Sequence, residues 1–221
     1  MSDENLVTKK VEEIESNLNQ LKKLGISKNE IIRRYEEKIL ALNNNRLTYF
    51  FALNMNVANV ERYGKMIIDS KDPIYNYYFA NDVKGADVRA HGQVIIESKD
   101  LEWNYIFAKD VEGADVRAHG RVIIESKVPI WNYRFASNVK GANVLAHQKV
   151  VIESNNPEAN FLFATNIKDV DIEPHVRIVI ESKYKDLNNK LSSALGNKYK
   201  VISIYNFLDD ALDDMTKKIK K

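Results

Sequence analysis

A 28-residue repeat constrains this chain more than any other feature of its sequence. Five similar segments, MIIDS, VIIES, VIIES, VVIES and IVIES, begin 28 residues apart at Met66, Val94, Val122, Val150 and Ile178. The same period relates five Phe-Ala pairs, which begin at Phe51, Phe79, Phe107, Phe135 and Phe163. A weaker copy precedes them, so the repeat covers roughly residues 28–183. A regular period of this length is typical of solenoids, in which each repeat packs on its neighbours.

Each repeat reads as two short helices. Asp72 and Pro73 form an N-cap followed by proline at the first helical position, and Gly85 is typical of a helix end. Asp87 then caps a helix that ends in VIIES. We call the helix that ends in this segment the leading helix of its repeat, and the helix with the Phe-Ala pair the trailing helix. In the last repeat, Pro174 falls in the tolerant first turn after Asp171.

These features predict an all-α fold, a right-handed α-solenoid of about five to six two-helix repeats with capping helices at both ends. We expect one continuous domain, with an N-terminal capping helix over 1–27, repeats over 28–183 and C-terminal capping helices over 184–221. The sequence Ser27-Lys28-Asn29-Glu30 is a capping box that opens the first repeat. The C-terminal cap carries an apolar stripe formed by Val201, Ile204, Leu208 and Leu212.

The N-terminal segment carries an apolar seam with steps of three and four residues. Its members are Val7, Val11, Ile14, Leu18 and Leu21. Such a seam either packs on the end of the solenoid or pairs two chains as a short coiled coil. We expect the capping role and a monomer, with dimerisation as the alternative.

Composition excludes several classes of protein. The 33 Lys and Arg residues nearly balance the 31 Asp and Glu residues, which argues against a strongly basic nucleic-acid-binding surface. Without cysteine, the chain forms no disulfide, thiolate zinc site or cysteine nucleophile. No apolar run reaches the roughly 18 residues of a membrane span, and the polar start is unlike a secretory signal. We therefore expect a cytoplasmic protein that does not contact membranes.

Polar residues recur at two positions of the repeat. All four histidines share one leading-helix position: His91, His119, His147 and His175. Asparagines share one trailing-helix position: Asn76, Asn104, Asn132, Asn160 and Asn188. Stacked repeats lie about 8–10 Å apart, too far for one metal ion whose ligands lie near 2 Å. We therefore predict structural ladders of buried neutral histidines and register-setting asparagines, with no metal or cofactor.

Aromatic and charged rows accompany these ladders. The aromatic row consists of Tyr75, Trp103 and Trp131, with Tyr77, Tyr105, Tyr133 and Phe161 close by. We interpret it as inter-repeat packing, with base stacking as the alternative. Exposed i,i+4 pairs are expected at Lys65–Asp69, Arg121–Glu125, Lys149–Glu153 and Arg177–Glu181. A basic row near helix ends suits the helix dipole, and also offers possible phosphate contacts, at Lys71, Lys99, Lys127 and Lys183.

Two outward positions vary between repeats while the framework stays constant. The trailing-helix row consists of Tyr78, Ile106, Arg134 and Leu162. The leading-helix row consists of Arg89, Arg117, Leu145 and Glu173. Varied exposed residues on a constant frame are where a solenoid contacts a partner. The alternative is drift on an unused surface.

The two-helix unit resembles HEAT-like α-solenoids in architecture, and the resemblance implies no particular site residues. It is compatible with a non-enzymatic protein-binding module acting as scaffold, adaptor or inhibitor, which is our first expectation. The abundance of Lys and Asn with only 8 Gly suggests a bacterial or phage source, where a regulatory or counter-defence role would fit. The alternative is a HEAT-like nucleic-acid-binding solenoid. A HEAT-like DNA glycosylase-type enzyme ranks third, because the sequence carries no Gly-rich phosphate loop, His-Glu-x-x-His or Gly-x-Ser-x-Gly motif.

Overall fold

A computed structural model describes residues 3–55, 59–182 and 184–196, and these residues form thirteen α-helices and no strand. After α1 (Asp3–Lys23), the helices alternate between leading and trailing. The leading helices are α2 (Lys28–Ala41), α4 (Val60–Asp69), α6 (Val88–Ser98), α8 (Val116–Ser126), α10 (Val144–Glu153) and α12 (Glu173–Glu181). The trailing helices are α3 (Asn45–Met55), α5 (Pro73–Asp82), α7 (Leu101–Asp110), α9 (Pro129–Asn138), α11 (Pro157–Asn166) and α13 (Lys185–Leu195). The six pairs confirm the predicted all-α solenoid.

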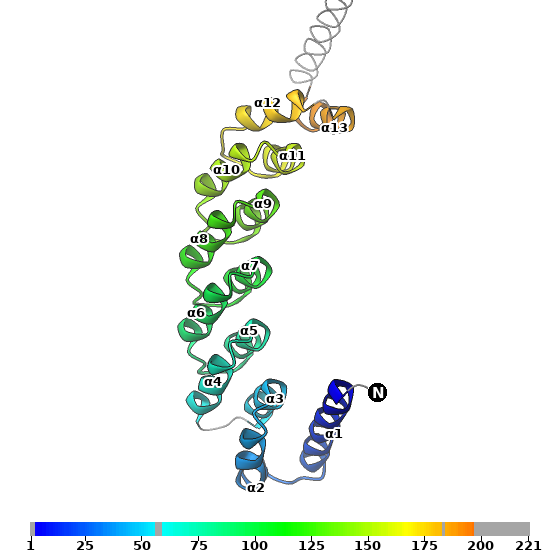
Figure 1. Ribbon diagram of the computed structural model, residues 1–221, viewed down its shortest axis with the longest axis vertical. Helices are drawn as coiled ribbons and strands as arrows, with labels where there is room; N and C mark the ends of the chain where they lie inside the picture. Colours follow the sequence, from blue (N-terminus) through cyan, green and yellow to red (C-terminus); the bar gives the residue numbers. More distant parts are fainter. Residues whose placement is uncertain (1–2, 56–58, 183, 197–221) are drawn as a thin grey trace, which may run out of the picture. The chain divides into compact units, whose positions relative to one another are not determined.

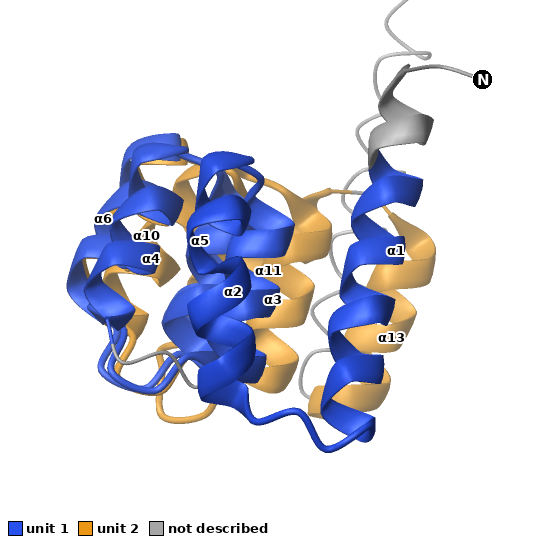
Figure 2. Ribbon diagram, turned by 90° about the horizontal axis from the view of Figure 1, so that it is seen from below, with its two compact units in different colours: residues 1–115 blue, residues 116–221 orange. Residues whose placement is uncertain are grey.

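The chain divides into two compact units. Unit 1 spans residues 1–115 and contains α1–α7, and unit 2 starts at Val116 and contains α8–α13 (Figure 2). Within each unit the leading helices form one layer and the trailing helices a second layer beside it (Figure 1). In unit 2, α13 occupies the trailing position of the sixth pair, against α11 and α12. The apolar stripe at Val201, Ile204, Leu208 and Leu212 lies outside the described residues, as does Lys183.

The helix ends follow the capping residues. A side-chain oxygen of Asp72 accepts a hydrogen bond from the Ile74 backbone N–H at 2.9 Å, and Pro73 opens α5. The helix ends at Asp82, three residues before the predicted stop, because Val83 adopts an extended backbone that turns its side chain into the core. Gly85 instead serves the following turn, with φ +88°.

The capping box at the start of α2 forms only in part. The Ser27 hydroxyl accepts from the Glu30 backbone N–H at 3.2 Å, as predicted. The Glu30 carboxylate, however, accepts hydrogen bonds from Arg33 and Arg34. In a full capping box the Glu30 carboxylate would accept a hydrogen bond from the backbone N–H of Ser27. Here it is bound instead by the two arginines one helical turn away.

Each unit has its own apolar core between the layers. In unit 1, Ile67 and Phe79 are buried together with residues of α1, α2 and α3. Val11 and Leu18 of α1 belong to this cluster, and Ile14 and Leu21 pack against it. The seam of α1 is thus covered within its own chain, in the capping arrangement; the side chain of Val7 lies outside the described part. In unit 2, separate clusters form around Phe163 and Val179.

Candidate protein-binding face

A repeated serine and asparagine network holds the trailing helices α5, α7, α9 and α11 in place. The Asn76 Nδ2 group donates to the carbonyl oxygens of Ile67 at 2.9 Å and Asp72 at 2.8 Å. The Ser70 hydroxyl donates to the same Ile67 carbonyl and accepts from the Asp72 backbone N–H. Equivalent serine bonds occur at Ser98, Ser126, Ser154 and Ser182. The asparagine thereby links the last turn of the preceding leading helix to the first turn of its own trailing helix.

The histidine ladder joins this network to the next leading helix. His91 is fully buried, with Nδ1 2.7 Å from Asn76 Oδ1. The same pair recurs in unit 2 as His147–Asn132 at 2.8 Å and His175–Asn160 at 2.6 Å. Because the asparagine N–H groups are already donated to carbonyls, its oxygen faces the ring and Nδ1 carries the proton. The four histidines and the first four asparagines of the ladder are all buried, whereas Asn188 is half-buried.

Burial fixes the charge state of these histidines. Burial lowers the pKa of His91, His147 and His175 from 6.5 to about 4, because the low-dielectric interior disfavours the imidazolium. The Nε2 atoms of His91 and His175 are buried without a hydrogen-bond partner. A proton added there would have no acceptor, so the neutral ring is the state that the core accepts.

The frame exposes a continuous set of aromatic rings on the trailing helices of unit 1, which we call the aromatic patch. Its members are Tyr49 of α3, Tyr75, Tyr77 and Tyr78 of α5, and Trp103 of α7. Ring centroids are 6.3 Å apart for Tyr49–Tyr75, 5.8 Å for Tyr49–Tyr78 and 5.6 Å for Tyr77–Trp103. Tyr78 is 39% exposed and the other four are half-buried. These rings therefore pack between repeats and also form an accessible surface.

The electrostatics keep the patch uncharged. Burial, together with a hydrogen bond of 2.5 Å to Asp82, raises the pKa of Tyr49. Burial likewise raises the pKa of Tyr75 and Tyr77. The phenols of Tyr49, Tyr75 and Tyr77 stay protonated at neutral pH, so the patch combines apolar ring faces with hydroxyl hydrogen-bonding groups.

The predicted trailing-helix row divides into two kinds of position. Tyr78 and Arg134 are exposed, and the guanidinium of Arg134 lies 4.8 Å from the ring centroid of Trp131. Ile106 and Leu162 are half-buried rather than fully outward. Their expected outward placement is therefore wrong in part, since each apolar side chain is partly covered.

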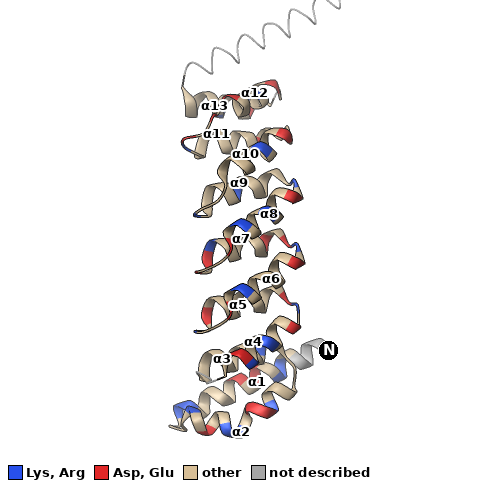
Figure 3. Cartoon of the chain, turned by 90° about the vertical axis from the view of Figure 1, so that its left-hand side faces the viewer, with Lys and Arg blue, Asp and Glu red and all other residues tan. Residues whose placement is uncertain are grey.

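The leading-helix row is exposed at every described member. Arg89, Arg117 and Glu173 extend into solvent, and Leu145 is 70% exposed. The leading-helix side carries both basic and acidic residues (Figure 3). Among the four predicted i,i+4 pairs, only Lys149–Glu153 lies within ion-pair distance, at 3.8 Å. The other three predictions are wrong, because exposed side chains gain too little from pairing to restrict their rotamers.

The predicted basic row has an unusual backbone. Lys71, Lys99 and Lys127 are exposed and all have φ near +56°, in the left-handed region. Asn43 and Asn155 hold the same conformation at the equivalent positions of other repeats. This conformation follows the ends of α2, α4, α6, α8 and α10, and asparagine adopts it more readily than lysine.

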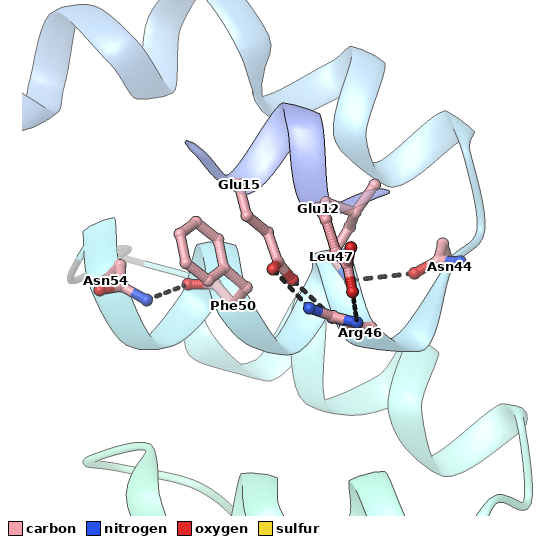
Figure 4. Close-up of polar contacts among 7 residues, drawn as sticks. All are labelled: Glu12, Glu15, Asn44, Arg46, Leu47, Phe50 and Asn54. Carbon is pink, nitrogen blue, oxygen red and sulfur yellow. Dashed lines mark hydrogen bonds and ion pairs between the residues drawn. The ribbon is translucent and has the colours of Figure 1, made fainter. Parts of the chain in front are cut away.

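An ion-pair cluster between α1 and α3 was not anticipated from the sequence. The Arg46 guanidinium donates two hydrogen bonds of 2.9 Å to Glu15 and lies 3.5 Å from Glu12 (Figure 4). The Glu15 carboxylate holds the pKa of Arg46 above its usual range. Arg46 is more than 30 residues from both glutamates in the sequence, so no local spacing signals the contact.

The described residues contain no group of three or more residues that could hold a metal ion, and no helix among them is long and apolar enough to cross a membrane. Comparison with known proteins found no matching family model, no matching curated protein and no matching solved structure.

Proposed function

We propose that this protein is a non-enzymatic protein-binding module, a HEAT-like scaffold, adaptor or inhibitor, whose partner contacts the trailing-helix face of unit 1. The aromatic patch is the observation that carries this proposal. Tyrosine and tryptophan supply most binding hot spots in protein interfaces, because they bury a large area at a small cost in side-chain entropy. Ile74 and Leu53, respectively 40% and 41% exposed, add apolar surface on the same helices.

The frame beneath the patch supports the same proposal. Phe79 and Asn76 of the same helix α5 are fully buried and hold the helix against its neighbours. A surface carried by such a helix is already ordered before binding, which reduces the entropy lost on association. A bacterial or phage source would suit a regulatory or counter-defence inhibitor of this kind.

The test is capture from bacterial lysate with the tagged full chain, in nuclease-treated and untreated halves. Three baits are compared: the natural sequence, Tyr78→Ala, and Arg89→Ala as a control on the leading-helix row. The expected result is a stoichiometric protein that survives nuclease, is lost with Tyr78→Ala and is retained with Arg89→Ala. Retention by Tyr78→Ala would overturn the proposal, and a simultaneous loss by Arg89→Ala would place the interface on the leading helices.

Nucleic-acid binding is the second candidate, and the left-handed backbone conformation of three lysines favours it. Lys71, Lys99 and Lys127 occupy left-handed positions where asparagine fits better, so a role for their charge would explain the residue type. Replacing all three with Asn keeps a suitable backbone and removes the charge. A large loss of DNA or RNA affinity, with a reduced salt dependence, would support this candidate. Salt-independent protein capture would contradict it.

A further inference from the structure

The N-terminal helix shows how the trailing-helix face receives another helix. In unit 1, α1 lies on the side of the trailing helices away from the leading helices (Figure 2). Val11 and Leu18 of α1 are buried in one cluster with Leu47 of α3, and Phe50 packs against the same cluster. The outer face of α3 is therefore covered by the apolar seam of an amphipathic helix.

The repeat places the covered face of α3 in register with open faces on the next trailing helices. With the 28-residue period, Leu47 corresponds to Tyr75 and Phe50 corresponds to Tyr78. Leu47 is 1% exposed beneath α1, whereas Tyr75 is half-buried and Tyr78 is 39% exposed. The positions that contact α1 on α3 thus stay accessible on α5.

The covered and open faces are continuous. Tyr75 packs against the cluster that contains Val11, and a cavity of about 410 Å³ lies between α1 and α5, lined by Thr8, Arg46 and Tyr75 among others. The aromatic patch therefore lies next to the part of the trailing-helix face that α1 covers. Packed helices lie 8–10 Å apart, so a second helix beside α1 would lie over the patch.

The charges on the open face differ from those that hold α1. Arg46, which binds the acidic side of α1, corresponds to Ile74 on α5 and Glu102 on α7. The charged residues of α5 and α7 are Asp82, Glu102, Lys109 and Asp110, and Lys109 is already paired with Asp110. A basic helix suits this face, whereas an acidic helix such as α1 and a nucleic-acid backbone do not.

We propose that the aromatic patch of unit 1 binds an amphipathic α-helix of the partner, with an apolar seam against Tyr75 and Tyr78 and basic residues facing Asp82 and Glu102. This inference rests on the proposed function and names the class of its partner. This is helix-in-groove recognition, in which the partner helix makes its apolar contacts through residues i, i+3, i+4 and i+7.

The experiment is a selection of displayed peptides on the immobilised full chain. One library presents helices of about 21 residues with varied seam and flanking positions, and a second presents the same residues without a helical pattern. Counter-selection uses the double variant Ile74→Ser with Tyr78→Ala, and Arg89→Ala is the control. Because the double variant could unfold, its melting temperature is compared with that of the natural chain, and Asp82→Lys serves as a second, charge-based variant.

The expected result is enrichment from the helical library of basic peptides with an apolar seam. These peptides should bind at least tenfold more weakly to the double variant and to Asp82→Lys, and equally to Arg89→Ala. Equal enrichment from both libraries, or peptides that ignore the double variant and Asp82→Lys, would overturn the inference. So would tighter, patch-dependent binding of a labelled oligouridylate, which would identify the patch as a base-stacking surface.

The two proposals fail in different ways. If lysate capture depends on Tyr78 while the selection yields no seam peptide, the protein-binding function stands and the helical partner does not. If lysate capture ignores Tyr78, the proposed function fails at its own test.

Discussion

His91 Nδ1 lies 2.7 Å from Asn76 Oδ1, and this contact joins two helices whose residues are 15 positions apart. The asparagine donates to two backbone carbonyls and accepts from the histidine, so one side chain ties together three helices. The contact recurs twice in unit 2, so the same buried bonds hold those repeats in register.

Acid should destabilise the fold through the buried histidines. Burial lowers the pKa of His91, His147 and His175 from 6.5 to about 4, so the unfolded chain binds their protons first as the pH falls. The histidine contribution to the free energy of unfolding is complete above about pH 6.5, is lost as the pH falls towards 4, and then levels off. Each histidine contributes about 3 kcal/mol to this change. Urea unfolding at several pH values between these limits measures it.

The variant His147→Asn separates this effect from general acid sensitivity. An asparagine keeps a donor for Asn132 but does not titrate, so the dependence of unfolding free energy on pH should become shallower. An unchanged pH dependence would contradict the assignment of the acid effect to the ladder.

Replacing a ladder asparagine with aspartate should be severe. In Asn132→Asp, carboxylate oxygen would replace the Nδ2 group that donates to Ile123 and Val128, and would face both carbonyls. We expect a loss of about 3–5 kcal/mol at pH 7, since one oxygen of the buried charge faces two carbonyls and the charge keeps only the His147 Nδ1–H as a donor. The matched control is Asn138→Asp on the exposed side of the same helix, where a change within about 1 kcal/mol is expected. Similar losses in denaturant melts would disprove the role of the ladder.

Neighbouring aromatic residues on α5 should respond differently to truncation. Phe79 is fully buried, with its ring centroid 5.0 Å from that of His91, so Phe79→Ala should cost about 3–5 kcal/mol by leaving a cavity. Tyr78→Ala should cost about 1 kcal/mol or less, because the ring is partly exposed. Ile106→Ala should also cost about 1 kcal/mol, more than a fully outward residue would. Thermal melts that rank Tyr78 with Phe79 would refute this assignment of helix faces.

Two glycines at the same repeat position should differ in their tolerance of alanine. A Cβ at Gly64 would lie 3.4 Å from Phe79 and His91 atoms, which is ordinary contact. A Cβ at Gly120 would lie 3.1 Å from Phe135, and the ring would have to shift. Alanine favours a helix over glycine by about 1 kcal/mol, so Gly64→Ala should be neutral or stabilising. Gly120→Ala should be less stable than Gly64→Ala, and the reverse order in denaturant melts would contradict the packing described.

The sequence by itself determined the features that depend on local chain chemistry. The 28-residue period, the Asp-Pro helix starts and the apolar spacing were sufficient to place two helices in each repeat, because capping and helical periodicity act over a few residues. The common spacing of the histidines and asparagines also placed them on the inner faces, where the structure has them.

Only the tertiary structure decided which side chains meet across helices. Arg46 binds Glu15 from 31 residues away, Tyr49 bonds Asp82 from 33 residues away, and Ile106 is half covered by its surroundings. Conversely, Lys65 and Asp69 have ideal sequence spacing and still do not pair. Contacts between helices depend on how the packed helices place long side chains. Pairing of exposed side chains depends on the rotamer entropy that the pair loses. The sequence spacing of two residues shows neither of these.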